Sequence, residues 1–193
     1  MSVLHPYSVE QLAARAEIHD RIHSWARGVD RKDWALAASG FHEGAIDDHG
    51  IYVGDVAGLI EMLQRRHIGI TMSVHNFCNI VVEFAQPDTA VVESYALVWQ
   101  RYEAGDQATR AAISGGSDTS DDPFDMIMAV RYADLFMLRS GTWKIQQRVT
   151  IFDATVRREV DPNGPKFAPS WQQGRRDGND PIQNLRREYG LGD

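Results

Sequence analysis

The apolar residues of this chain change their spacing once, from a helical period in the N-terminal third to strand-like runs in the remainder. Between Ser8 and about Val29, apolar side chains recur three or four positions apart, which predicts an amphipathic helix with Ser8 as its N-cap. Gly28 and the Asp30–Asp33 step are expected to interrupt this helix before a short second helix that starts at Trp34.

A third helical segment, from about Asp55 to Arg66, precedes four runs rich in β-branched and aromatic residues, which predict strands. The runs lie around Asn79–Phe84, Ala90–Tyr102, Met126–Leu138 and Trp143–Phe152. The turn signals Pro87-Asp88 and Ser140-Gly141 favour antiparallel hairpins over helical crossovers. Helices followed by a meander of strands predict an α+β domain, with helices packed on one face of an antiparallel sheet.

Two segments differ from this pattern. Gly105–Asp125 is polar and acidic and contains paired glycines, so we interpret it as a long hairpin loop. The chain after Asp161 is rich in proline, glycine and polar residues, with a short helix expected near Ile182–Tyr189. Residues 1–160 are therefore predicted to form the domain, and residues 161–193 a tail that docks on the domain or on a neighbouring subunit.

Length and charge narrow the class of protein. A chain of 193 residues with 43% hydrophobic residues can bury one substantial core. The net charge of -7 and the absence of a lysine and arginine stripe argue against a nucleic-acid partner. Cys78 is the only cysteine, and neither a signal-peptide pattern nor a long apolar run occurs. We therefore expect a cytoplasmic protein without a membrane partner.

The residues most suited to acid–base chemistry are Asp30 and His75. Asp30 follows the apolar stripe of the first helix near Trp25. It is either an N-cap of the second helix or a base beside a hydrophobic wall, where desolvation raises the pKa of a carboxyl group. His75 lies in a predicted strand, and its ordinary pKa of about 6.5 suits proton transfer if a carboxylate orients the ring. Sequence spacing leaves open whether the two meet.

Four other histidines have simpler interpretations. His19 and His23 share one face of the first helix, but no third ligand of suitable spacing accompanies them, so no metal site is expected. His42 and His49 lie in a connection that contains glycine and aspartate, and we expect both to be exposed.

Charged and aromatic residues of the strands are candidates for ligand contacts. Arg131 and Arg148 are expected to form outward-facing ion pairs, whereas an inward guanidinium would bind a substrate oxygen. A concave sheet would line a ligand cavity with some of its aromatic residues. These are Trp25, Phe77, Tyr95, Trp99, Phe136 and Phe152. No phosphate-binding loop, dinucleotide fingerprint or nucleophile elbow occurs, so no cofactor is expected.

Several segments together resemble the SnoaL-like branch of the nuclear transport factor 2-like superfamily, over about residues 8–156. They are Ala16–Asp20 with Gly28–Asp30, Phe41–Ala45, Met72–Asn79, Ala90–Tyr95, Arg131–Phe136 and Gly141–Ile145. The resemblance implies a conical barrel, in which a strongly curved antiparallel sheet and N-terminal helices enclose a deep hydrophobic pocket. It also implies a homodimer or homotrimer.

Members of this branch include scytalone dehydratase, hexachlorocyclohexane dehydrochlorinase and bile-acid dehydratase, which eliminate water or halide without a cofactor. Their shared Asp/His dyad matches Asp30 in Gly28-Val29-Asp30 and His75 in Val74-His75-Asn76. The resemblance therefore implies a lyase or isomerase for a small hydrophobic cyclic molecule, with Asp30 and His75 catalytic. The residues expected to bind the substrate are Trp25, Asn76, Phe77, Tyr95, Trp99, Arg131 and Phe136.

The chain departs from the family pattern where the leaving group would sit. Trp25 replaces the tyrosine of related dehydratases and the lysine of the dehydrochlorinase, and an indole does not supply the proton that those residues can. No arginine clearly matches the one that acts on the leaving group. Two alternatives stay open: Asp30 itself is the base, or the chain is a non-catalytic ligand-binding or structural module such as a ring-hydroxylating dioxygenase small subunit.

Overall fold

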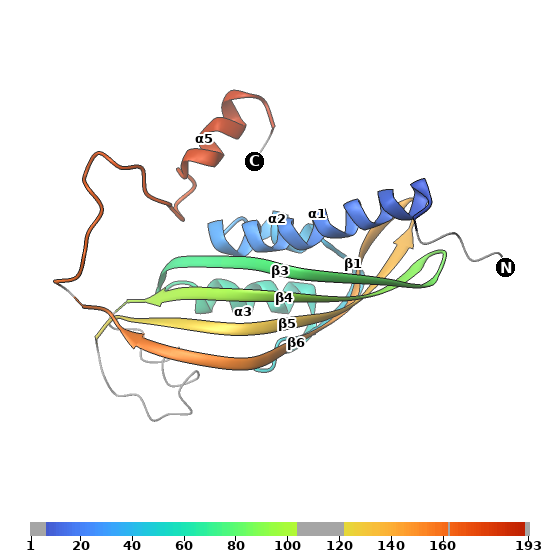
Figure 1. Cartoon of the computed structure of the whole chain (residues 1–193), viewed down its shortest axis with the longest axis horizontal. Coiled ribbons are helices and arrows are strands. Elements are labelled where there is room, and N and C mark those ends of the chain that lie inside the picture. Colours follow the sequence, from blue (N-terminus) through green and yellow to red (C-terminus); the bar gives the residue numbers. More distant parts are fainter. Residues whose placement is uncertain (1–6, 104–121, 162, 192–193) are drawn as a thin grey trace.

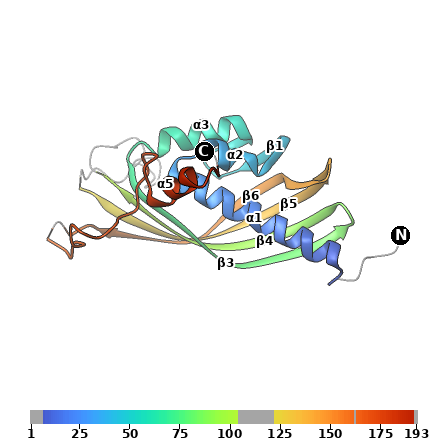
Figure 2. The same ribbon diagram turned by 90° about the horizontal axis from the view of Figure 1, so that it is seen from above.

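In the computed structural model, which describes residues 7–103, 122–161 and 163–191, helices cover one face of a curved six-stranded sheet (Figures 1 and 2). The helices are α1 (Val9–Arg31), α2 (Trp34–Ser39), α3 (Val56–Arg66) and α5 (Pro181–Glu188). The strands are β1 (Phe41–Asp48), β2 (Val53–Asp55), β3 (Ile70–Gln86), β4 (Thr89–Tyr102), β5 (Phe124–Arg139) and β6 (Thr142–Glu159). The expected α+β class, with N-terminal helices over a curved sheet, is confirmed.

The sheet has the strand order β2-β1-β6-β5-β4-β3. Strands β3 to β6 form the predicted antiparallel meander. The expectation of a purely antiparallel sheet is wrong at one place, because β1 lies parallel to β6. These two strands are far apart in the sequence, so no hairpin forces them to be antiparallel. Strand β1 was itself missed, since its Gly44 and acidic residues give a weak strand signal.

Helix α1 runs farther than its sequence suggests. Ser8 caps its N-terminus by accepting a hydrogen bond from the Gln11 amide, as predicted. The helix then continues through Gly28 and ends at Lys32, whose φ of 58° is left-handed. Gly28 is needed for close packing rather than for a break, because a Cβ atom there would lie 2.5 Å from the backbone nitrogen of Ala37 in α2. Asp30 therefore lies inside the last turn of α1.

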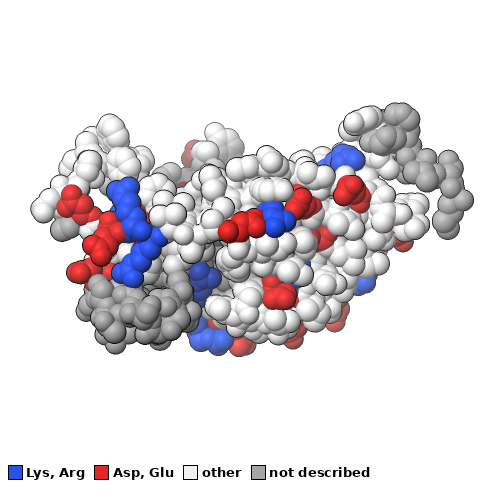
Figure 3. Space-filling model, turned by 60° about the horizontal axis from the view of Figure 1, so that its bottom comes forward, with Lys and Arg blue, Asp and Glu red and all other residues white. Residues whose placement is uncertain are grey.

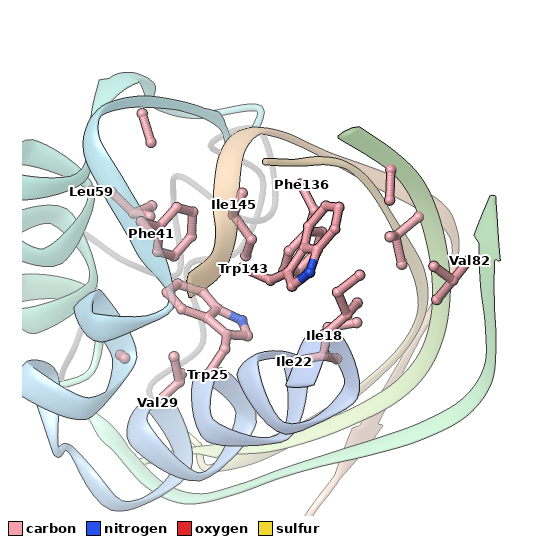
Figure 4. Close-up of a cluster of buried hydrophobic side chains, with 14 of the residues drawn as sticks. Ile18, Ile22, Trp25, Val29, Phe41, Leu59, Val82, Phe136, Trp143 and Ile145 are labelled. Carbon is pink, nitrogen blue, oxygen red and sulfur yellow. The ribbon is translucent and has the colours of Figure 1, made fainter. Parts of the chain in front are cut away.

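The main core lies between α1 and the concave face of the sheet (Figure 4). Ile18, Ile22, Trp25 and Val29 point from α1 into this space at helical spacing. Their partners on the sheet include Phe41, Val82, Phe136, Trp143 and Ile145. Burial of these side chains fixes the rotation of α1 about its axis, and hence the direction in which Asp30 faces.

One ion pair is buried within this core. Arg148 of β6 binds Asp134 of β5 through two hydrogen bonds of 2.7 Å, and both side chains are 0% exposed. The guanidinium carbon lies 5.1 Å from the ring centre of Trp25 and 4.6 Å from that of Tyr132. The prediction that Arg148 faces outward is thus wrong. A register shift in β6 places Trp143 and Ile145, and then Arg148, on the same inner face.

Arg131 forms the outward-facing ion pairs expected of a charged strand residue. It lies on the outer face of β5 and binds Glu93 and Asp153 at 2.8 and 2.7 Å. On the face of the molecule shown in Figure 3, basic side chains lie largely beside acidic ones.

The C-terminal segment contacts the end of α1 that carries Asp30. The chain leaves β6, passes around the end of the sheet and returns to place α5 beside α1 (Figures 1 and 2). Asp180 caps α5 and binds Arg31 at 3.3 Å. The predicted short helix is therefore confirmed at Pro181–Glu188. Of the predicted loop Gly105–Asp125, residues 105–121 lie outside the described residues, and Phe124 already belongs to β5. Among the described helices, none has the length and apolar character to cross a membrane.

We expect Asp134→Ala to destabilise the fold strongly, by about 3–5 kcal/mol, because it leaves the Arg148 guanidinium buried without its counter-ion. Urea denaturation measures the free energy of unfolding. The matched control, Glu93→Ala, removes a partly exposed partner of Arg131 on the neighbouring strand and should change the stability little. Equal effects of the two substitutions would contradict the account of the buried pair.

Candidate functional site

Asp30 and His75 meet directly. Nδ1 of His75 lies 2.6 Å from Oδ1 of Asp30, and the two side chains are only 7% and 11% exposed. The carboxylate accepts two more hydrogen bonds, from the Ser73 hydroxyl at 2.7 Å and from the backbone amide of His75 at 2.8 Å. Strand alternation places Ser73 and His75 on the same inner face of β3, so both can reach the last turn of α1.

These contacts set the charge of the carboxyl group. Burial alone would raise the pKa of Asp30, but the facing His75 and the hydrogen bonds from Ser73 and the His75 amide together hold that pKa below its ordinary value. Asp30 is therefore ionised at neutral pH. The expectation that desolvation makes Asp30 a stronger base is wrong, because three donors compensate for its burial.

An ionised Asp30 also selects the tautomer of His75. A carboxylate only accepts hydrogen bonds, so Nδ1 of His75 carries the proton that it shares with Asp30. In the neutral ring the other nitrogen, Nε2, then has a free electron pair. No hydrogen bond between described residues occupies Nε2, and this geometry is that of a general base with a carboxylate orienting it.

A second ring of contacts supports the dyad. Gln100 donates to the Ser73 hydroxyl at 3.4 Å, and its own side-chain oxygen accepts hydrogen bonds from Arg66 and Tyr102. Sequence reasoning missed Ser73 and Gln100. Ser73 lies two positions before His75 on β3, and Gln100 lies two positions after Val98 on β4, so all four side chains point to the inner face. This shared orientation is evident only once the pairing of the two strands is known.

His75 opens onto a small inner cavity of about 20 Å³, which is room for one or two water molecules. Its walls include Trp25, His49, Val98, Tyr132 and Phe152. The deep pocket implied by the family resemblance is thus nearly filled, because bulky aromatic side chains from α1, β5 and β6 occupy it.

A larger groove of about 570 Å³ adjoins this cavity at the end of the sheet formed by residues 126–128 of β5 and 152–155 of β6, which we call the open end. His49, Arg66, Met128 and Phe152 line both spaces, so the cavity and the groove meet at these side chains. The groove is lined mostly by apolar atoms, and its volume lies within the range of about 300–1,000 Å³ typical of small-molecule sites.

The structure separates the predicted substrate-binding residues into three groups. Trp25 lines the inner cavity, and Phe77 packs on the inner face against the ring of Tyr132 at 5.5 Å. Phe136 is fully buried in the core away from the cavity. The other four, Asn76, Tyr95, Trp99 and Arg131, point to the opposite face of the sheet.

Strand parity therefore keeps these four residues away from the inner cavity. On β4 the buried positions include Val92, Ser94, Ala96, Val98 and Gln100. This alternation leaves the intervening Tyr95 and Trp99 on the convex face, each 38% exposed. Asn76 likewise follows the inward His75 on β3. Aromatic character alone does not indicate which face a strand residue occupies.

The expected exposure of His49 is also wrong. It lies directly after β1 and is buried, with Nδ1 3.3 Å from Oδ1 of Asp47 and 3.2 Å from the Thr150 hydroxyl. His42 is half-buried and bonds through Nε2 to the carbonyl oxygen of Met137. Both placements follow from the missed strand β1, which joins the sheet beside β6.

His19 and His23 lie on one face of α1 and contact aromatic rings. Their rings lie 6.4 Å apart, and His23 packs edge-on against Phe77 at 6.4 Å. Within residues 7–103, 122–161 and 163–191, no group of three or more His, Cys, Asp or Glu side chains has an arrangement that could hold a metal ion.

Arg176 of the C-terminal segment joins the two elements that carry the dyad. Its guanidinium donates to the carbonyl oxygens of Val29 and Asp30 at the end of α1, and to that of Ile70 at the start of β3. It also donates to Nδ1 of His67 at 2.6 Å. Burial, followed by the positive charge of Arg176, lowers the pKa of His67 to about 2, so this ring is a neutral acceptor.

Comparison with known proteins supports the family resemblance and the fold described above. The family model for the SnoaL-like domain matches residues 10–149. No curated protein matches the sequence.

Among solved structures, a scytalone dehydratase-like protein from Novosphingobium aromaticivorans is similar with a TM-score of 0.62 and 19% identity, over 82% of this chain and 98% of that one. A hexachlorocyclohexane dehydrochlorinase (LinA-type3) from Novosphingobium barchaimii has a TM-score of 0.62 and 19% identity, over 83% and 98%. An aromatic ring hydroxylase-like protein from N. aromaticivorans has a TM-score of 0.59 and 19% identity, over 77% and 94%. At these identities the likeness shows a shared fold.

The low pKa of His67 predicts a pH dependence of stability. The unfolded state binds a proton on this ring below about pH 6.5, whereas the folded state does so only near pH 2, so folding loses up to about 1.4 kcal/mol for each unit of pH below 6.5. His67→Gln, which still offers Arg176 an acceptor, should remove this slope between pH 6 and pH 5 in urea denaturation. An unchanged slope would show that His67 is not the responsible group.

Proposed function

We propose that this chain, which belongs to the SnoaL-like domain family, is a cofactor-independent lyase or isomerase that acts on a small hydrophobic cyclic molecule. The observation that supports it most is the hydrogen-bonded Asp30–His75 pair at the wall of a small inner cavity. A histidine held in this way is poised to remove a proton from carbon, which is the step common to elimination and to double-bond shifts.

In the proposed reaction, Nε2 of His75 takes a proton from the carbon beside a carbonyl group. The proton on Nδ1 stays with the ring, and the Asp30 carboxylate stabilises the imidazolium that forms. The electron pair of the broken C–H bond then forms a carbon–carbon double bond, either by expelling a leaving group or by accepting a proton at another carbon. A positioned base of this kind contributes about 10²- to 10⁴-fold to the rate.

Negative charge that develops on the carbonyl oxygen needs hydrogen-bond donors in the same cavity. Burial raises the pKa of Tyr132 to about 12, so its hydroxyl stays protonated at neutral pH and is able to donate. Nη1 of the buried Arg148 has no hydrogen-bond partner among the described residues. We propose the Tyr132 hydroxyl, which lines the cavity, in place of the convex-face residues Asn76, Tyr95 and Arg131. Arg148 does not line the cavity itself, and its positive charge lies behind the ring of Tyr132.

The groove at the open end supports an apolar substrate. Met126, Met128, Ile51 and Phe152 give it flexible apolar walls. Because the inner cavity has room only for water, the reactive end of the substrate displaces this water and moves Phe152, whose side chain lines both spaces. The rest of the substrate then stays in the groove.

The alternative is a non-catalytic binding or structural module. The expected capping role of Asp30 is wrong, because Asp33 caps α2. In such a module Asp30 would only join α1 to β3, and His75 would only pack. The buried contact of 2.6 Å and the free Nε2 support the enzyme instead, since a module needs neither an oriented imidazole nor a cavity beside it.

We also propose that the protein forms a homodimer or homotrimer, as its family resemblance implies. Sedimentation velocity of the full chain should therefore give a mass two or three times 21.7 kDa. A species of 21.7 kDa at all concentrations would exclude both assemblies.

The proposed base can be tested without knowledge of the leaving group. A panel of hydrophobic cyclic ketones is incubated with the protein in D₂O, and deuterium uptake at the carbon beside the carbonyl is followed by mass spectrometry. His75→Gln should reduce the exchange rate by about 10²- to 10⁴-fold. Asp30→Asn should also reduce it, because the amide no longer selects the productive tautomer.

His42→Gln is the matched control, because it makes the same change at a histidine outside the cavity. It should leave exchange unchanged. Absence of exchange with the wild-type chain across the panel, or equal exchange by the wild type and His75→Gln, would contradict the proposed function.

A further inference from the structure

His67 is a buried imidazole of the cavity wall that the reaction proposed above does not use. It is the C-cap of α3, is 1% exposed, and lines the inner cavity together with His75. Its ring packs edge-on against that of Trp34, with 5.6 Å between the ring centres. The cavity therefore contains a rigid imidazole beside the proposed base.

The hydrogen bond from Arg176 selects the tautomer of His67. A guanidinium only donates hydrogen bonds, so Nδ1 of His67, 2.6 Å from Nη2 of Arg176, is the accepting nitrogen. A neutral imidazole that accepts at Nδ1 carries its hydrogen on Nε2. His67 and His75 therefore have opposite tautomers: Nε2 of His75 accepts, whereas Nε2 of His67 donates.

The surroundings of His67 keep its ring neutral. Burial is the main cause that lowers its pKa to about 2, and the positive charges of Arg176 and Arg66 lower it further. His75 and Lys32 act in the same direction. Positive groups thus face the ring from α3, from β3, from the end of α1 and from the C-terminal segment, and the described hydrogen bonds give it no carboxylate partner.

Nε2 of His67 borders open space. No hydrogen bond within residues 7–103, 122–161 and 163–191 engages this nitrogen. Nor is it one of the fully enclosed side-chain nitrogen and oxygen atoms of these ranges that lack a partner. The space that the ring lines is the inner cavity, which has room for one or two water molecules. An N–H group at this wall donates to an oxygen atom that enters the cavity.

Arg176 belongs to a part of the chain that the family domain does not include. The match to the SnoaL-like domain ends at residue 149, whereas Arg176 lies in the segment that returns to place α5 beside α1 (Figures 1 and 2). Its contacts with carbonyl oxygens of α1 and β3 hold the guanidinium in place. Its contact with Nδ1 of His67 then acts on a side chain of the cavity wall.

We infer that His67 is a catalytic hydrogen-bond donor that binds the carbonyl oxygen of the substrate, with Arg176 of the C-terminal segment as its positioning residue. This inference rests on the proposed function, because the oxygen becomes negative only when His75 removes the neighbouring proton. A neutral N–H suits the task, since it stabilises the oxygen without giving up its proton. No bond to His67 forms or breaks, and the Tyr132 hydroxyl is the second donor in the same cavity.

Arg66 is the competing donor. It lines the same cavity, its Nη2 binds Gln100 and the Tyr102 hydroxyl, and its Nε has no partner among the described residues. If Arg66 alone stabilised the oxygen, loss of the His67 N–H would leave the rate unchanged. Substitution of His67 therefore separates the two arrangements.

The first test asks whether the Nε2 hydrogen of His67 binds a carbonyl oxygen. The probes are the cyclic ketone that exchanges deuterium fastest and its analogue in which an exocyclic methylene group replaces the oxygen. Each is added to ¹⁵N-histidine-labelled chain, with the His67 signals assigned from His67→Gln. The hydrogen should be on Nε2 and should shift downfield with the ketone only. A hydrogen on Nδ1, equal shifts with both probes, or no shift with the ketone overturns the inference.

The second test measures kcat and KM for deuterium exchange of the same ketone. His67→Leu should lower kcat by about 10²- to 10³-fold, the usual effect of losing one such donor. His67→Gln should lose less than about tenfold, because its amide offers Arg176 an acceptor and the cavity a donor. His42→Leu, the same change at a histidine outside the cavity, should leave kcat unchanged.

Arg176→Met isolates the positioning role. It keeps the ring of His67 and removes the donor to Nδ1, so the ring hydrogen should divide between the two nitrogens and kcat should fall. Arg175→Met is the matched control, since the adjacent Arg175 pairs instead with the exposed Asp177, and it should change neither.

The outcomes separate the inference from the proposed function. Full kcat in folded His67→Leu, or a fall of kcat in Arg176→Met with the tautomer unchanged, overturns the inference alone. If His67→Leu fails to fold, the titration of the wild-type chain decides. A wild-type chain that exchanges no ketone overturns the proposed function, and the catalytic role of His67 with it.

Discussion

The contact between the Asp30 carboxylate and β3 is the constraint on which the rest of the site depends. It joins the helical layer to the sheet at the point where α1 ends, through His75, the His75 amide and Ser73. Arg176 reinforces the same junction from outside by binding carbonyl oxygens on both elements. A buried carboxylate costs free energy unless donors surround it, so the protein has to hold these groups in one arrangement. That requirement is what makes the imidazole of His75 rigid.

Around this junction the interior divides into an apolar part and a polar part. One end of the concave face packs α1 against tryptophan, phenylalanine and isoleucine side chains, and contributes stability. Toward the open end the same face carries the Asp134–Arg148 pair and His49 beside Asp47. Polar groups buried in this way stabilise little on their own. Their concentration around a cavity beside an apolar groove is the feature that favours a catalytic interpretation over a structural one.

The sequence predicted the fold class from local signals, whereas the pairing of Asp30 with His75 was implied only by the family resemblance. Helical and strand periods differ, and the Gly28-Val29-Asp30 and Val74-His75-Asn76 segments each carry a recognisable motif. The lining of the cavity lacked such signals. Tyr95 and Trp99 looked suitable, but their parity on β4 turns them outward. The register shift in β6 turns Arg148 inward, and the parallel pairing of β1 with β6 buries His49. Bulges and pairing between distant strands depend on tertiary packing. A local sequence pattern therefore does not predict which residues they turn inward.

The most direct test of the central claim is the protonation state of His75 in the free protein. Long-range ¹H–¹⁵N correlation spectra of histidine-labelled chain, assigned with His75→Gln, distinguish the two ring nitrogens. The account predicts, at a pH where the ring is neutral, a proton on Nδ1 shifted strongly downfield by its hydrogen bond to Asp30, and an unprotonated Nε2. A ring protonated on Nε2, or one that averages between tautomers as in free histidine, would contradict it.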